Sequence, residues 1–208
     1  MDTLADHKEF IVRQKVEGIE VFTGFETSNR YTVSSGSGEP VLYAYEESNW
    51  LARQFLATHR PLTFHFIDNA KTPVLQAKRG FFWLFSHLHV TDSHGQPLGS
   101  LQRRFAILKR KFSVHDPSGK PIAEIVGPLM KPNTFIVSQH DREVARVTKK
   151  WSGVLREMAT DADTFHVQRE ATTTDPKLWA LVLAAAFAID MDFFESKGNR
   201  RSSPTFGR

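Results

Sequence analysis

The 208-residue chain contains no cysteine. This absence excludes disulfide bonds, thiolate metal sites, a cysteine nucleophile and S-palmitoylation. The first ten residues contain neither a basic stretch nor an apolar stretch of the kind that makes up a secretory signal. We therefore expect a cytoplasmic protein.

The sequence also has no motif of a conventional enzyme. It contains no Gly-x-Ser-x-Gly nucleophile motif, no glycine-rich phosphate-binding loop and no His-Glu-x-x-His zinc motif. We therefore predict a protein that is not an enzyme, has no catalytic residues and needs no cofactor, with calcium as the one open case.

What is present is an ordinary globular composition. Hydrophobic residues make up 40% and charged residues 24% of the chain, which argues against a largely disordered protein. The length suffices for one sizeable domain or two small ones. Seventeen phenylalanines favour strands and a thick apolar core.

Charge is unevenly distributed along the chain. Residues 51–150 contain 16 Lys and Arg against 6 Asp and Glu, whereas residues 1–50 contain 4 against 9. The densest basic cluster consists of Arg103, Arg104, Lys109, Arg110 and Lys111. Such a region attracts the phosphates of nucleic acid or of anionic lipid headgroups. A solvated strand face without a ligand is the alternative.

A turn pattern recurs every 24 residues: Asp68, Asp92 and Asp116 are each followed five residues later by a proline. Aspartate opens a turn by accepting bonds from the backbone, and proline ends a loop where no ladder N–H is needed. Related turns at 34–40 and 139–142 extend the series, between segments that alternate polar and apolar residues. The pattern predicts an antiparallel meander of roughly ten strands that must close or stack. A solenoid is the other interpretation.

His87 and His89 share one face of an expected strand. Two imidazoles in this arrangement are compatible with a metal site, but no third ligand follows at a characteristic spacing. We favour exposed or hydrogen-bonded histidines at these positions.

One segment near the end of the chain is apolar on every side. Asp175 is a candidate N-cap, Pro176 suits the first helical position, and residues 178–189 have no polar interruption. A helix of this length spans about 18 Å, well short of the ~30 Å hydrocarbon core of a bilayer. We therefore expect the strands to enclose this helix, with a membrane anchor as the alternative. The tail at 197–208 is expected to be disordered.

Seven groups of residues match one family in their order along the chain. They are Tyr43-Ala-Tyr-Glu-Glu-Ser48, Arg60-Pro-Leu62, Asp68, Asp116-Pro-Ser-Gly119 with Gly127-Pro128, Lys150-Trp-Ser-Gly153 with Glu157, Thr160-Asp-Ala-Asp-Thr-Phe165, and Ile189-Asp190 with Phe194-Glu195. On these residues the chain resembles the phospholipid scramblases, in the tubby C-terminal-like, or LURP-one-related, barrel superfamily.

The resemblance implies a mainly β fold, in which a closed antiparallel barrel of about twelve strands surrounds a buried hydrophobic C-terminal helix. We divide the chain accordingly into an N-terminal segment at 1–25, a scramblase-like domain at 26–196 and a tail at 197–208. The resemblance also implies a link to membrane phospholipids. The family's named activity is calcium-activated bidirectional lipid movement.

The family's proposed calcium loop begins at Asp161 and Asp163, which match in this chain. Further along, Arg169 brings positive charge into the segment, and Thr172 stands where a carboxylate is expected. Calcium takes about six to eight oxygen ligands, so weak binding is the most we expect. The alternative is that both aspartates cap a turn before a strand.

Two functional hypotheses follow. The first is a protein of scramblase type, and the second is a non-scrambling lipid-binding or regulatory module that holds anionic headgroups, as tubby-like barrels hold phosphoinositides. Both hypotheses predict that the partner is the anionic phospholipid surface at the inner face of the membrane. The predicted lipid-binding residues are Arg103, Arg104, Lys109, Arg110 and Lys111. If one strand runs through this cluster, Arg103 and Lys109 share a face opposite Arg104 and Arg110. A nucleic-acid partner ranks last, because no base-recognition motif is present.

Overall fold

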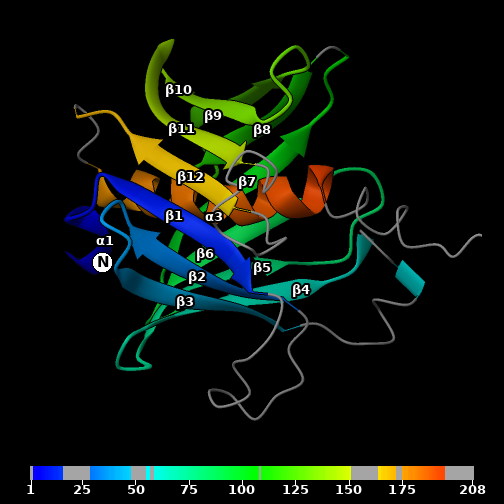
Figure 1. The fold of residues 1–208 in the computed structure, drawn as a ribbon. Helices are drawn as coiled ribbons and strands as arrows, with labels where there is room; N and C mark the ends of the chain where they lie inside the picture. The colour runs from blue at the N-terminus through cyan, green and yellow to red at the C-terminus, as the bar shows by residue number, and fades with distance from the viewer. Residues whose placement is uncertain are drawn as a thin grey trace, which may run out of the picture.

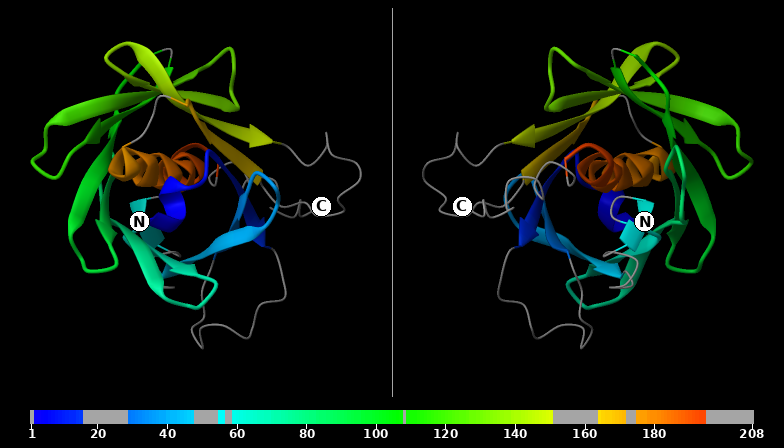
Figure 2. Two further views of the ribbon diagram at one scale, coloured as in Figure 1. Left: turned by 90° about the vertical axis from the view of Figure 1, so that its left-hand side faces the viewer. Right: turned by 90° about the vertical axis from the view of Figure 1, so that its right-hand side faces the viewer.

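The computed structural model describes residues 2–15, 29–47, 55–56, 59–107, 109–150, 164–171 and 175–194. Within these residues, twelve strands form a closed antiparallel barrel with a long helix inside it (Figure 1, Figure 2). The expected fold class is thereby confirmed, and the solenoid alternative is wrong. The tail at 197–208 lies outside the described residues.

Along the chain, the strands follow one another and are joined by connections at the two ends of the barrel. The strands are β1 (Glu9–Lys15), β2 (Arg30–Ser35), β3 (Pro40–Glu47), β4 (Leu62–Asp68), β5 (Pro73–Arg79), β6 (His87–Asp92), β7 (Pro97–Arg104), β8 (Lys109–His115), β9 (Pro121–Pro128), β10 (Thr134–Gln139), β11 (Arg142–Lys150) and β12 (Thr164–Arg169). The helices are α1 (Asp2–Ala5) and α3 (Pro176–Phe193).

Every strand pairs with its sequence neighbours, and β1 closes the barrel against β12. Phe10 lies opposite Val167 across this closure. β1 falls in the stretch 1–25 that we placed before the barrel domain, and the structure makes it a barrel strand. The groups of residues that carry the resemblance begin at Tyr43, so they gave no indication of this strand.

The two ends of the barrel are built differently. Because neighbouring strands run in opposite directions, connections after even-numbered strands lie at one end and those after odd-numbered strands at the other. We call the first the turn end (36–39, 69–72, 93–96, 116–120 and 140–141) and the second the loop end (including 80–86, 105–107 and 129–133). α3 starts at the turn end and finishes at the loop end (Figure 1).

Aspartate turns make up much of the turn end. In each of the three expected turns, Oδ1 of Asp68, Asp92 or Asp116 accepts hydrogen bonds from the backbone N–H groups two and four residues later. The third residue after the aspartate has a positive φ, which is 75° at Gly95 and 87° at Gly119. Glycine adopts this conformation without strain. The hydrogen bonds confirm the turns predicted from the 24-residue pattern.

α3 begins where the sequence predicts. Asp175 accepts a hydrogen bond of 2.9 Å from the backbone N–H of Lys177, and Pro176 lies in the first turn. Every side chain from Leu178 to Met191 is buried. No helix in the described part of the chain combines the length and the apolar character that a membrane crossing requires.

Aromatic side chains fill much of the space between α3 and the strands. Phe187 packs against Tyr31, Phe64 and Phe66, with ring centroids 4.9 to 5.1 Å apart. Three alanines, Ala184 to Ala186, are small enough to let the barrel wall approach the helix closely. The barrel interior therefore provides the apolar surroundings that the helix requires.

Gly99 of β7 marks a close approach between the wall and α3. Its φ is 147°, and a Cβ atom there would lie 2.3 Å from the carbonyl oxygen of His115 and 2.9 Å from Leu181 Cδ1. Both the backbone conformation and the lack of space require glycine at this position.

The C-terminal turn of α3 carries two aspartates in a buried environment. Asp190 accepts from the Tyr31 hydroxyl at 3.2 Å and from Lys149 Nζ at 3.3 Å, and Asp192 accepts from Arg79 Nη1 at 2.9 Å. The helix dipole disfavours negative charge at a C-terminus. Cations from β5 and β11 offset this cost, so the pairs fix the depth of the helix in the barrel.

Replacing Gly99 by alanine is expected to lower the free energy of unfolding by about 1–3 kcal/mol, because the new methyl group overpacks the wall. Gly80→Ala serves as the control, since a Cβ at Gly80 meets no atom within 4 Å. Urea denaturation measures both variants. Equal stability of the two proteins would contradict the close approach.

Asp190→Asn is expected to lower the free energy of unfolding by about 3–5 kcal/mol, because it removes the negative charge that faces the buried ammonium of Lys149. The control is Glu143→Gln, which breaks the exposed pair of Glu143 with Arg146 at 2.8 Å and should cost at most about 1 kcal/mol. Denaturation midpoints compare the two. A loss no larger than that of the control would show that the buried pair does not hold the helix.

Candidate functional site

The basic cluster divides between the inside and the outside of the barrel. β7 ends at Arg104 and β8 begins at Lys109, so the chain reverses within the cluster. Arg103 lies 4.8 Å from the ring centre of Phe193 on α3, and therefore points inward. Arg103 and Lys109 were expected to share a face only if a single strand ran through the cluster. That condition is not met, and the side chain of Arg103 points to the same side of the wall as that of Arg110.

Arg110 lines the mouth of the barrel at the loop end. Its guanidinium lies 4.3 Å from the ring centre of Phe135 and 5.5 Å from that of Phe193. Within the described structure its Nε and Nη2 atoms are buried and make no hydrogen bond. Burial lowers the pKa of Arg110, and the aromatic faces supply the compensating attraction. Arg103 and Arg110 thus serve the packing around the end of α3.

The other three residues of the cluster lie on the outer surface of the barrel. Arg104 and Lys109 are exposed, and Lys111 is half-buried beside Glu124, with Nζ 2.8 Å from the carboxylate. Further exposed lysines stand at the same end, at the ends of β5 and β11 and in the β9–β10 connection: Lys78, Lys131 and Lys150.

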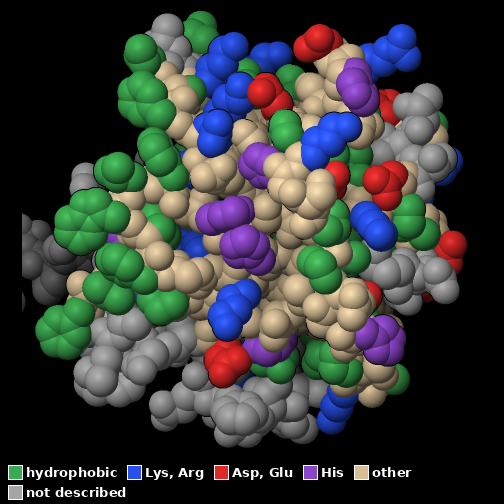
Figure 3. Space-filling model, turned by 180° about the vertical axis from the view of Figure 1, so that it is seen from behind, with side chains coloured by type: hydrophobic (Ala, Val, Ile, Leu, Met, Phe, Trp, Pro, Cys, Tyr) green, Lys and Arg blue, Asp and Glu red, His purple; other side chains and the backbone are tan. Residues whose placement is uncertain are grey.

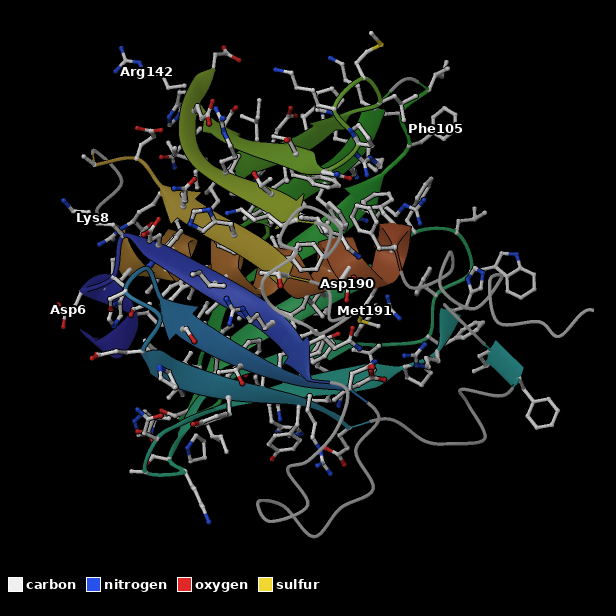
Figure 4. The ribbon with its side chains drawn as sticks, viewed as in Figure 1. Asp6, Lys8, Phe105, Arg142, Asp190 and Met191 are labelled. Carbon is white, nitrogen blue, oxygen red and sulfur yellow. The ribbon has the colours of Figure 1, made fainter. Side chains whose placement is uncertain are left out.

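The exposed charge of the described residues is therefore polarised along the barrel. At the turn end, exposed cations such as Lys8, Lys120 and Arg142 are accompanied by the recurring aspartates, Asp6 and Asp141. Most exposed cations near the loop end have no carboxylate close to them in the sequence. Figure 4 shows Asp6 and Lys8 at the turn end and Phe105 at the opposite end. A positive surface at one end attracts anions toward that end.

Large hydrophobic side chains are exposed at the same end. All nine such residues in the described ranges lie in connections that follow odd-numbered strands: Phe55, Phe81, Trp83, Leu84, Phe85, Phe105, Ile107, Leu129 and Met130. Seen from behind, hydrophobic side chains gather along the loop-end edge of the molecule (Figure 3). This feature was not predicted from the sequence. The apolar run 81–85 between two strand patterns could have indicated it.

The β5–β6 connection is held at both ends by one carboxylate. Arg79, before it, donates to Asp192 Oδ1, and Ser86, after it, donates to Asp192 Oδ2. Burial raises the pKa of Asp192, while Arg79 and Ser86 oppose the rise. Phe82 lies 4.9 Å from the Arg79 guanidinium. These contacts fix the connection against the end of α3.

A histidine group lies on the barrel wall beside this connection. The rings of His87 and His89 are 4.1 Å apart, and both line an open cavity of about 440 Å³ that also involves Lys78 and Phe85. Burial lowers the pKa of His87, and His89 and His115 lower it further. Among the described residues, no group of three or more His, Asp and Glu is arranged to hold a metal ion.

The candidate calcium residues Asp161 and Asp163 lie outside the described residues. The structure does describe the segment that follows them, where residues 164–169 form β12. Arg169 closes that strand, donates to the carbonyl oxygen of Ala5 and lies 5.5 Å from the ring of Trp179. Arg169 therefore belongs to the barrel wall and contacts both the N-terminal segment and α3.

Comparison with known proteins gives consistent matches. A family model described as Scramblase matches residues 1–196. Phospholipid scramblase 1 of Mus musculus is 30% identical over 213 residues, which cover 96% of this chain and 65% of that protein. The human protein of the same name is 28% identical, over 96% of this chain and 67% of its own length. A solved structure of an Arabidopsis thaliana protein aligns over 88% of this chain and 91% of its own, with a TM-score of 0.47 and 12% identity.

The chain spans slightly less than two thirds of the mouse relative's length. The family match nevertheless extends over nearly all of the chain and includes all twelve strands and α3. It confirms the resemblance drawn from the sequence segments. This chain belongs to the Scramblase family.

Proposed function

We propose that the protein binds the surface of anionic phospholipid membranes through the loop end of its barrel. The observation that carries the proposal is that the exposed cations at this end, among them Arg104, Lys109 and Lys131, outnumber the neighbouring carboxylates. Each basic residue near an anionic membrane contributes about 1 kcal/mol of attraction. Several on one end therefore give a useful affinity and orient the barrel.

The proposal narrows the sequence prediction for the basic cluster. Arg103 and Arg110 point into the mouth of the barrel and pack on aromatic rings. We therefore assign the contact with lipid headgroups to Arg104, Lys109 and Lys111, on the outer surface. Lys131, which the sequence analysis left out, joins them because the β9–β10 connection lies at the same end.

Bidirectional lipid movement is the second candidate function, favoured by membership of the Scramblase family. A headgroup that crosses a bilayer needs a polar path past the hydrocarbon. In the described structure, α3 and its aromatic neighbours fill the barrel interior. Movement of lipid by this chain would therefore take place along the outside of the barrel, after the membrane binding proposed above.

The variant Arg104→Glu/Lys109→Glu/Lys131→Glu is expected to bind vesicles of phosphatidylserine and phosphatidylcholine about 100-fold more weakly or worse, since three attractive charges become repulsive. Co-sedimentation at low salt measures the affinity. The matched control is Lys8→Glu/Lys120→Glu/Lys177→Glu, which makes the same change in net charge with exposed residues of the turn end. Equal loss in both variants, or binding that is independent of salt, would contradict the proposal.

A labelled-lipid flip assay in vesicles separates binding from movement. Under the second candidate function, the protein accelerates flip and Asp161→Asn/Asp163→Asn removes any response to calcium. Unchanged flip at high protein load, with vesicle binding intact, would limit the chain to the non-scrambling lipid-binding role.

A further inference from the structure

We infer that the loop end does not rest on the headgroups alone but inserts apolar side chains into the interfacial layer of the bilayer. The inserting residues come from three connections: Phe81, Trp83, Leu84 and Phe85 of β5–β6, Phe105 and Ile107 of β7–β8, and Leu129 and Met130 of β9–β10. This inference rests on the proposed function, since it specifies how the same end meets the membrane.

These side chains are exposed in the folded protein. The exposed fraction is 80% at Trp83, 82% at Ile107 and 94% at Met130. Single exposed apolar side chains are ordinary on protein surfaces, but a group gathered in one region marks an interaction surface. Here the group comes from three separate connections that share only their position at one end of the barrel, so local sequence alone does not account for it.

The β5–β6 connection is prepared for insertion by its attachment to the core. Arg79 and Ser86 bind the same carboxylate, Asp192, so both ends of the segment 80–85 are held at the end of α3. Phe82 turns back onto Arg79, and its neighbours Phe81 and Trp83 remain exposed. A surface fixed in this way loses little conformational entropy when it binds.

Charge next to the apolar side chains indicates a membrane and not a protein as the partner. Arg104 precedes Phe105, and Lys131 follows Met130. Protein interfaces are depleted in lysine. Segments that lie in the membrane interface combine tryptophan, phenylalanine and leucine with lysine and arginine, because the cations reach the phosphates while the apolar groups enter the acyl boundary.

Insertion adds a component of binding that salt does not screen. Because burial of each large apolar side chain is expected to strengthen binding about tenfold or more, Trp83→Ser/Leu84→Ser should weaken binding to the same vesicles about 100-fold at high salt. Weak attraction at low salt should persist in this variant. Both substitutions replace exposed side chains, so far-ultraviolet circular dichroism and the urea denaturation midpoint should be unchanged.

A fluorescent reporter tests insertion directly. The chain has no cysteine, so Leu84→Cys provides a single site for the environment-sensitive dye NBD. We expect its emission to rise and shift to the blue on phosphatidylserine/phosphatidylcholine vesicles, and lipids with a nitroxide in the upper acyl chain to quench it. The control is Ser93→Cys at an exposed position of the turn end. There the emission of the label should indicate an aqueous environment both before and after vesicles are added.

The outcomes separate this inference from the proposed function. Vesicle binding with an unchanged signal at position 84 would overturn the inference and leave the proposed function standing. Absence of binding to anionic vesicles would overturn both. A stable dimer formed without vesicles and dissolved by Trp83→Ser/Leu84→Ser would overturn the inference, because a second copy of the chain would then cover the surface.

Discussion

A helix that is apolar on every side has to be surrounded, and this requirement organises the whole barrel. α3 is buried from Leu178 to Met191, and the barrel strands together with α1 provide its apolar contacts. Its last turn carries Asp190 and Asp192, which would be costly there without cations from the wall. Hydrophobicity therefore determines that the helix is enclosed, and charge pairing determines how far along the barrel it lies.

The same pairing connects the core to the surface. Asp192 ends the buried helix and at the same time binds both ends of the β5–β6 connection. The turn end needs no such support, because its aspartate turns satisfy their own backbone groups. The turn end is thus made of short turns that are stabilised by their own hydrogen bonds. The loop end has longer connections, and the conformation of the β5–β6 connection depends on contacts with the core.

Local patterns could be predicted from the sequence, and long-range pairings could not. The aspartate turns and the N-cap at Asp175 depend on neighbouring residues, so their chemistry is visible in a short window. Arg79 and Asp192 are 113 positions apart, and no periodicity connects them. The face shared by Arg103 and Lys109 could be stated only for one continuous strand, because the alternation of side chains does not carry across the reversal between β7 and β8. The apolar run 81–85 was passed over because hydropathy alone does not distinguish a core segment from an exposed connection.

The order of the elements along the chain has a consequence for biosynthesis. Strands β2 to β11 pair with their neighbours, so hairpins can form as the polypeptide leaves the ribosome. β1 can pair with β2 early, but its second partner, β12, is synthesised much later. The barrel interior is filled only when α3, the last of the described elements, has been made. A nascent chain that has not yet reached Pro176 is an open shell with an unfilled phenylalanine-rich lining. At this stage chaperones have the most surface to recognise, and aggregation is most favoured.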